Sequence, residues 1–395
     1  MKYLITSTLL LALGLSACVY EPEQFEESSS APASGSSSEI GTVRAINSGK
    51  QICNPSISQD TANYPGAMLW LNFGGVLNVT PKDSNYTTRQ VVQHDRLTVT
   101  NQDNEVVWYL MMDSTDCQFQ DPEWSTHPNF VVATRGVDSE GSKGCTDLDY
   151  GIFAARMSDH KQFWLVDKGL GEFTTPHLWV DPSVTDLDTT ASDTTVQGFF
   201  GTENVRLVYV DTKSEINFVD FANGGVKKTV KLKKPAEMQK ENWTPDSPMI
   251  SPDGKFIVFN AVKIMGNSTV MKSYIQKLDA NATAVEMERS SDMMGEPMQP
   301  HWFKYGARLF VTWTEVSENN FFVKGDLSLA ETQDGSLGRT VMREISLDAN
   351  APADLAMQWV GSVIEIAPVP MTGGRSPDGK FLATGYQNGF MLELP

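Results

Sequence analysis

The sequence predicts an all-β protein built from repeated units of four short antiparallel strands, and three observations support this. A nine-residue segment recurs almost unchanged at 251–259 and 376–384. Short apolar runs alternate with clusters of turn residues throughout the chain after residue 40. No long stretch has the apolar spacing of three to four residues that marks an amphipathic helix. The period of the repeat decides the architecture.

Each copy of the repeat is a tight turn followed by a buried strand. The two best copies share the turn sequence Ser-Pro-Asp-Gly, with Pro252, Asp253, Gly254, Pro377, Asp378 and Gly379 as the turn residues. Proline presets the backbone for the second position of a β-turn, aspartate caps the turn, and glycine accepts its last conformation. Phe, Ile, Val and Leu follow, as in a strand inside a packed sheet. We therefore assign these turn residues a structural role.

Weaker copies extend the repeat along the chain. The reference turn positions are 66, 128, 204, 254, 306 and 379. Further strand-like segments follow the turns at 204 and 254, namely 216–221, 227–232, 271–278 and 284–288. Units of about 50 residues with four short strands are typical of propeller blades. The pattern therefore predicts a β-propeller with six blades, or with seven if one of the two longest intervals contains another blade.

The repeat resembles the blade motif of TolB-type, WD40-like β-propellers, also called the PD40 repeat. Residues 251–259 and 376–384 carry the resemblance, and 300–311 share part of the motif. In that family the first strand precedes the turn, the second follows it, and two more complete the blade. The resemblance therefore implies four-stranded antiparallel blades in this chain.

The last blade lacks a strand within its own part of the sequence. Only 16 residues follow Gly379, which is enough for strands at 380–386 and 389–394. We expect residues 40–46 to supply the outer strand, because closure by the N-terminal segment removes an exposed sheet edge. The predicted propeller domain is therefore 40–395.

The first eighteen residues have the pattern of a secretion signal. Lys2 is followed by an apolar stretch at 3–15 and then by Leu-Ser-Ala-Cys, ending at Cys18. The stretch is too short to span a bilayer, which needs roughly 20 apolar residues. Its end resembles the lipobox of bacterial lipoproteins, in which the cysteine is acylated and becomes the new N-terminus. We expect 1–17 to be a lipoprotein signal peptide and Cys18 to carry lipid. The alternative is an ordinary secretory signal with a chance cysteine.

The residues after the lipobox predict a tethered protein. Residues 18–39 are rich in Glu and then in Ser, so beyond the lipidated cysteine we interpret them as a disordered linker. Two or more acyl chains anchor a protein stably to a membrane. Val19 follows the cysteine, whereas Asp at that position retains enterobacterial lipoproteins in the inner membrane. We therefore expect an outer-membrane lipoprotein, on the periplasmic face rather than the cell surface.

Three cysteines remain besides Cys18, and an odd number leaves one without an intramolecular partner. Cys117 and Cys145 lie in polar segments that flank one predicted strand, so we predict a disulfide between them. Cys53 is then the remaining thiol. Zinc sites need closely spaced Cys or His ligands, and the sequence contains neither CxxC nor HxxxH. We expect no metal and no other cofactor.

The charge of the chain limits its partners. The formal net charge is −18, and cleavage of 1–17 removes one lysine. Nucleic acids need clustered Lys and Arg, so we expect no nucleic acid partner, whereas a basic protein partner suits the negative charge. The longest basic run contains Lys227, Lys228, Lys231, Lys233 and Lys234. We interpret it as the solvated face and exit of one strand, with contact to an acidic partner as the alternative.

Motifs for nucleophilic, zinc-protease and nucleotide chemistry are missing from the sequence. His177 and His301 share a Pro-His context and are expected to face the central channel, as in propeller lyases that bind a divalent metal through channel histidines. They are our candidates for a ligand rim, and partly buried strand histidines are the alternative. Glu296, Asp246 and Asp181 neighbour predicted turns, and two carboxylates facing each other can do acid and base chemistry. No catalytic residue is assigned.

The expected function follows from the anchor and the fold together. We expect a membrane-anchored envelope lipoprotein whose β-propeller is a protein-binding or scaffold module, and the sequence favours this over catalysis. The alternative is a glycan-active enzyme, similar to a polysaccharide lyase or hydrolase, or a carbohydrate-binding lipoprotein that uses the channel mouth. A fold alone does not name an activity, so the choice depends on the site.

Overall fold

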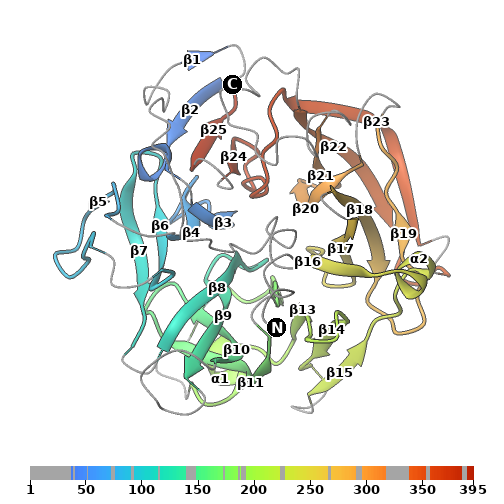
Figure 1. Cartoon of the computed structure of the whole chain (residues 1–395), viewed down its shortest axis with the longest axis horizontal. Helices are drawn as coiled ribbons and strands as arrows, with labels where there is room; N and C mark the ends of the chain where they lie inside the picture. Colours follow the sequence, from blue (N-terminus) through green and yellow to red (C-terminus); the bar gives the residue numbers. More distant parts are fainter. Residues whose placement is uncertain are drawn as a thin grey trace, which may run out of the picture.

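The computed structural model describes residues 37–38, 41–50, 52–72, 76–89, 93–113, 116–138, 148–171, 174–185, 187, 193–222, 227–265, 268–290, 296–316, 338–352, 356–384 and 389–395. In this part of the chain, β-sheets stand side by side in a ring around a central axis (Figure 1). The two α-helices described, α1 (Val196–Phe200) and α2 (Ala236–Lys240), have five residues each. The prediction of an all-β fold is confirmed.

Six sheets occur among the described residues, and their strands are named in hydrogen-bonded order. The first is β3 (Ile52–Ile57), β4 (Met68–Asn72), β6 (Arg96–Thr100), β7 (Glu105–Met111) and β5 (Thr80–Pro81). The second is β8 (Asp116–Trp124), β9 (Phe130–Asp138), β10 (Leu148–Arg156) and β11 (Gln162–Leu170). The third is β12 (His177–Val180), β13 (Val205–Val210), β14 (Ile216–Asp220) and β15 (Lys228–Lys231).

The remaining three sheets follow in the same way. The fourth is β16 (Trp243–Ile250), β17 (Phe256–Met265), β18 (Ser268–Lys277) and β19 (Val285–Glu286). The fifth is β20 (Met298–Tyr305), β21 (Arg308–Val316), β22 (Gly338–Leu347) and β23 (Met357–Ala367). The sixth is β24 (Phe381–Thr384), β25 (Phe390–Glu393), β2 (Gly41–Ala45) and β1 (Ser37–Ser38). Among the described residues, five of the six sheets have the predicted four antiparallel strands, and the first sheet has a fifth strand, β5, which pairs in parallel with β7.

The predicted turns lie at equivalent places in these sheets. Positions 66, 128, 204, 254 and 306 each lie between the first and second strand of a sheet. In the sixth sheet, Gly373 and Ser376 bond to the backbone of β24, so 373–376 takes the place of a first strand before the turn at 379. In the turn at 254, Asp253 Oδ1 accepts the Lys255 N–H at 3.1 Å, and Gly254 has φ +72°.

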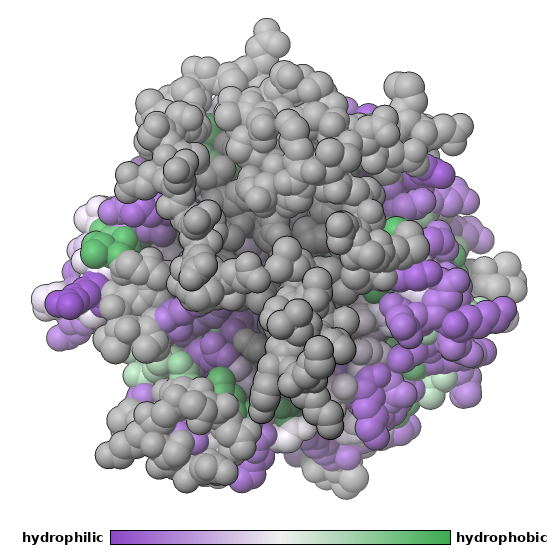
Figure 2. Space-filling view, in the orientation of Figure 1, coloured by the Kyte–Doolittle hydropathy of each residue, from purple (hydrophilic) through white to green (hydrophobic). Residues whose placement is uncertain are grey.

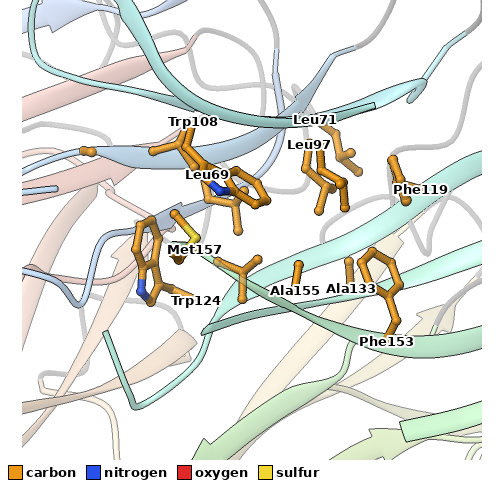
Figure 3. Packing of buried hydrophobic residues seen from close by; sticks show 14 of the residues in the cluster. Leu69, Leu71, Leu97, Trp108, Phe119, Trp124, Ala133, Phe153, Ala155 and Met157 are labelled. Atoms are coloured by element: carbon orange, nitrogen blue, oxygen red, sulfur yellow. The ribbon is translucent and has the colours of Figure 1, made fainter. Parts of the chain in front are cut away.

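The apolar core lies between neighbouring sheets. Figure 3 shows side chains of the first and second sheets meeting face to face, among them Leu69, Trp108, Phe119 and Phe153. Comparable buried clusters lie between each other pair of neighbouring sheets, including the sixth and the first. The ring therefore owes its stability to six interfaces rather than to one central core, and losing one sheet would expose two apolar faces.

The N-terminal segment completes the sixth sheet. β2 pairs with β25, from Thr42 opposite Glu393 to Ala45 opposite Phe390. Arg44 Nη2 and Glu393 Oε2 form an ion pair at 2.7 Å. The prediction that residues 40–46 pair with the C-terminal strands is confirmed, but β2 is not the outer strand, because β1 lies outside it and 373–376 takes the place of the first strand. β1 pairs with β2 from Ser37 opposite Thr42 to Ser38 opposite Gly41, so the sheet extends into the predicted linker of 18–39.

Candidate functional site

In five sheets a residue followed by proline lies at the first strand, which is the strand nearest the axis (Figure 1). Four of these steps lie inside the strand, and the step in the third sheet comes directly before it. The five steps are Asn54-Pro55, Asp121-Pro122, Thr175-Pro176, Ser247-Pro248 and Gln299-Pro300. In each step the residue before proline has a positive φ, between 39° and 50°. Proline has no N–H for the ladder, and the strand register shifts at four of the steps. These are β-bulges, which re-aim side chains and often lie beside functional sites.

Side chains at the bulges join one sheet to the next. Asn54 Nδ2 in β3 donates to Asp121 Oδ1 in β8 at 2.9 Å. The other oxygen of Asp121 accepts the N–H groups of Thr174 and Thr175, just before β12, at 3.1 Å each. The Ser247 N–H in β16 then donates to Thr175 Oγ1 at 3.2 Å. Four consecutive sheets are therefore linked near the axis.

Further contacts continue this linkage around the axis. Trp302 Nε1 in β20 donates to the Met249 carbonyl in β16 at 2.9 Å. The Ile57 N–H in the first sheet donates to the Gly373 carbonyl beside β24 at 3.1 Å. A Cβ atom on Gly373 would lie only 2.4 Å from the Pro55 carbonyl oxygen. Gly373 occupies the position that proline holds in the other sheets. The close approach of Pro55 leaves no room for a side chain there, which explains the glycine.

His177 and His301 both lie near the axis, close enough for their charges to interact. Burial lowers the pKa of His177 to about 3, with a further contribution from His301. Burial also lowers the pKa of His301. Both rings are therefore neutral at physiological pH. The structure brings the two predicted rim histidines together, and the ligand-rim role stays a prediction.

The hydrogen bonds of these histidines assign their tautomers. The Ile250 N–H donates to His177 Nδ1 at 3.0 Å, so the neutral ring carries its proton on Nε2. His301 Nδ1 donates to the Gln299 carbonyl at 2.9 Å, which leaves Nε2 bare. A histidine ligand needs a bare nitrogen, and His177 has none to offer. No group of three or more metal-ligating side chains occurs among the described residues.

Glu123 is a functional candidate that the sequence did not reveal. Burial raises its pKa to about 8, although hydrogen bonds from Ser56 and the Trp124 backbone oppose the shift. Ser56 Oγ donates to the Glu123 carboxyl, and the Trp124 N–H donates to Ser56 Oγ at 2.9 Å. At neutral pH the side chain is therefore mostly protonated. Glu123 follows Asp121 by two residues, with a proline between them, and His177 and His301 each follow a proline in the same way. This shared spacing is the sequence signal that identifies Glu123.

Asp246 is the other carboxyl with a raised pKa. It lies in β16 opposite Asn260, and burial followed by the charge of Asp121 raises its pKa to about 7. A carboxyl with this pKa can donate or accept a proton near neutral pH. Asp181 instead lies in the turn after β12 and accepts from Asn204 Nδ2 at 2.6 Å, and Glu296 precedes β20. The predicted turn carboxylates therefore do not form one cluster.

The cysteines differ from expectation at one position. Cys53 and Cys117 are both disulfide-bonded, and no described cysteine is free. Cys53 is therefore not the remaining thiol in this structure. Cys145 lies outside the described residues, as does Cys18, so the Cys117–Cys145 bond and the lipidation stay predictions. Asp116 pairs with Val137, so Cys117 lies at the end of the sheet where β9 ends and β10 begins.

Comparison with known proteins is informative about the fold alone. No protein-family model and no curated protein matches the chain. The fold is propeller-like. Native Bacillus subtilis arabinanase is 9% identical over 76% of this chain and 96% of that one, with a TM-score of 0.36. A Cellvibrio cellulosa α-L-arabinanase complexed with arabinohexaose is 8% identical over 79% and 96%, with a TM-score of 0.34. The N-terminal domain of Nup159 is 10% identical over 91% and 98%, with a TM-score of 0.30. These are distant structural matches to β-propeller proteins.

Proposed function

We propose that the protein is a lipid-anchored outer-membrane protein whose six-bladed, TolB-type propeller binds a protein partner. Six sheets with an apolar cluster between each neighbouring pair support the blade number. The Ser-Pro-Asp-Gly repeat supports the TolB-type assignment, and the lipobox-like end at Cys18 supports the anchor. The described residues contain no helix that is both long and apolar enough to span a membrane.

The observation that carries the binding role is the outer strand β23. It has eleven residues and is the last strand in its sheet, so among the described residues its outer edge has no paired strand. Val360 and Ile364 lie opposite Glu344 and Met342 on one face and are 42% and 44% exposed. An edge strand with exposed apolar side chains is a template for pairing with another chain.

The other outer strands lack this combination of length and two exposed apolar side chains. β19, β5 and β1 have two residues each, and β15 carries Lys228 and Lys231. β11 has nine residues, but it carries Lys168 and one exposed apolar side chain, Trp164, which is covered on one face by Arg135. Short length and lysines are the usual protection of a sheet edge. β23 is protected only by the bulge at Gly361, where Arg343 Nε donates to the Gly361 carbonyl at 2.9 Å. The strand segments on both sides of the bulge are therefore the proposed contact for a partner.

A pull-down with matched variants tests this function. V360K/I364K should lose the bound protein from solubilised envelope, because lysines on an edge strand oppose pairing. V76K/V285K is the control, since Val76 and Val285 are also exposed valines, 59% and 41% accessible, but lie elsewhere on the ring. Retention of the same partner by V360K/I364K would contradict the proposed contact. Equal melting temperatures would show that both variants are folded.

A second candidate is a glycan-active site at the axis, favoured by Asp246. Its pKa of about 7 and its interaction with Asp121 match a general acid beside a charged carboxylate. D246N should then abolish cleavage of an acidic or neutral oligosaccharide panel, whereas D181N, in the turn after β12, should not. Full activity of D246N, or no cleavage by the wild type, would remove this candidate.

A further inference from the structure

The segment 227–240 is basic in a strongly acidic protein. It contains six lysines and one glutamate, whereas the chain as a whole has a net charge of −18. It forms β15, the connection to α2, and α2 itself, on the rim of the ring. The described surface around this side of the rim is largely hydrophilic in the view of Figure 2. Solubility alone does not explain why positive charges cluster in one segment of a protein with a large negative net charge.

The carboxylates around this segment have other partners. Asp220 in β14 lies opposite Lys228 and accepts the Ala222 N–H at 2.9 Å. Asp211 and Glu215 pair with Lys231, and Glu241 pairs with Lys263. Glu286 pairs with Lys272 at 2.6 Å, and Glu237 accepts a hydrogen bond from the Tyr274 hydroxyl. Among the described residues, five lysines of this segment have no ion pair with a carboxylate. Lys227 Nζ donates to the Leu165 carbonyl at 3.1 Å, and the other four are Lys228, Lys233, Lys234 and Lys240, which we call the basic rim.

The backbone beneath the basic rim is fixed. Gln276 Nε2 donates to the Lys233 carbonyl at 2.9 Å, and Gln239 Nε2 donates to the Lys234 carbonyl at 2.8 Å. Leu232 and Met238, which flank them, are buried at 6% and 4% exposure. The lysine side chains therefore extend from an ordered edge rather than from a loose loop. A preorganised surface loses less entropy on binding.

We propose that the basic rim docks an acidic polypeptide segment, extended along the free edge of β15. The described residues pair β15 only with β14, so its outer backbone groups are available to an added strand. Lysines along the edge repel a like edge but attract carboxylates on an incoming strand. The lysines of the basic rim therefore favour pairing of β15 with an acidic strand over pairing with a basic one. This surface is distinct from β23 and does not depend on it.

A polypeptide fits this surface better than an anionic membrane does. Surfaces that bind bilayers combine lysines with apolar side chains that insert, and no exposed large apolar side chain lies in 227–240. β1 and β2, where the predicted linker joins the ring, lie on the opposite side from β15 and α2 (Figure 1). The tether therefore does not direct the basic rim toward the membrane.

The test uses the full chain and a fluorescent twelve-residue peptide of alternating Glu and Thr. K228E/K233E should weaken peptide binding by roughly tenfold, because two attractions become repulsions. K168E/K255E makes the same charge change at two exposed lysines outside the segment and should change affinity less than twofold. A Gln-Thr peptide should not bind, and binding of the Glu-Thr peptide should weaken between 0.05 and 0.5 M salt.

Three outcomes would overturn the proposal. Equal weakening in both double variants would indicate a general charge effect, and unchanged binding in K228E/K233E would exclude these lysines. Lysine-dependent binding to phosphatidylglycerol vesicles without peptide binding would assign the rim to the membrane. V360K/I364K should keep full peptide affinity, so failure at β23 and failure at the basic rim are distinguishable.

Discussion

Asn54 and Asp121 join the first and second sheets through a side-chain hydrogen bond of 2.9 Å at the axis of the ring. Both residues precede a proline and both have the left-handed backbone conformation, with φ of 44° and 46°. Such a conformation costs a non-glycine residue on the order of 1–3 kcal/mol. The hydrogen bond between them offsets part of that cost, so sheet attachment and backbone strain are coupled at the same two positions.

Replacement of Asp121 should loosen the ring at its axis. D121A removes the acceptor for Asn54 and for the backbone N–H groups of Thr174 and Thr175, in a site that is 3% exposed. Buried donors left without an acceptor cost about 1–3 kcal/mol each. We expect a loss of about 3 kcal/mol in the free energy of unfolding, measured by urea denaturation.

N54A is the matched control for D121A. It removes one of the three donors to Asp121 and leaves the carboxylate in place, so a loss of about 1 kcal/mol is expected. An effect of N54A equal to that of D121A would show that Asp121 acts only through Asn54 and would contradict the three-donor account.

The buried titratable groups predict a fall in stability above pH 6.5. Burial raises the pKa of Glu123 from 4.5 to about 8 and that of Asp246 to about 7, so the folded state keeps protons that the unfolded state has lost. Stability is then lost as the pH rises toward the folded values. The lowered pKa of His177 acts in the opposite direction, but only below about pH 6.5.

E123Q tests this pH dependence. Glutamine cannot lose a proton and can still accept from Ser56, so the decline in unfolding free energy between pH 6.5 and 8 should become shallower. Denaturation curves at several pH values, compared with E203Q as a control at an exposed loop glutamate, provide the measurement. An unchanged slope in E123Q would show that Glu123 titrates normally in the folded protein.

The turns and strands were predictable because their chemistry is local. Pro252, Asp253 and Gly254 bend the chain whatever surrounds them, and the apolar run that follows must be buried. Pairing of 40–46 with the C-terminal strands followed from counting the residues after Gly379. In each case the evidence lay within a few neighbouring residues or in the length of a segment.

The axis of the ring was not predictable in the same way. A proline inside a segment normally argues against a strand there. The sequence therefore did not indicate that Asn54-Pro55 and Asp121-Pro122 lie within the first strands of their sheets. The raised pKa of Glu123 depends on burial by a neighbouring sheet, which no local pattern encodes. Only the shared spacing of Glu123, His177 and His301 after their prolines would have connected them.

The disulfide pairing can be tested by peptide mapping. Cys53 and Cys117 are both bonded in the structure, and an acylated Cys18 sulfur cannot form a disulfide. We expect non-reduced peptide mapping of membrane-extracted protein to show the Cys117–Cys145 bond, and the same map identifies the partner of Cys53. A Cys53–Cys117 peptide would contradict this pairing.

The anchor makes a separate prediction. C18S should prevent acylation and release the protein from the membrane, because a single lipidated residue provides the proposed attachment. Fractionation in high salt, which removes proteins held by charge alone, measures the effect. Wild-type protein should remain in the pellet, and a C18S protein that also remains there would show that another part of the chain holds the membrane.

Closure of the ring by the N-terminal strand can be tested by deletion. Removing 40–48 takes away β2, the Arg44–Glu393 ion pair, and the packing of Val43 and Ile46, which are 4% and 0% exposed. It also leaves β25 with an unpaired edge. We expect the melting temperature to fall by several degrees, because one or two kcal/mol is a large share of net stability, and aggregation to increase. Deleting 20–36 keeps β1 and β2 and should change neither property. A protein without 40–48 that melts like the full chain would show that the sixth sheet is complete without its N-terminal strand.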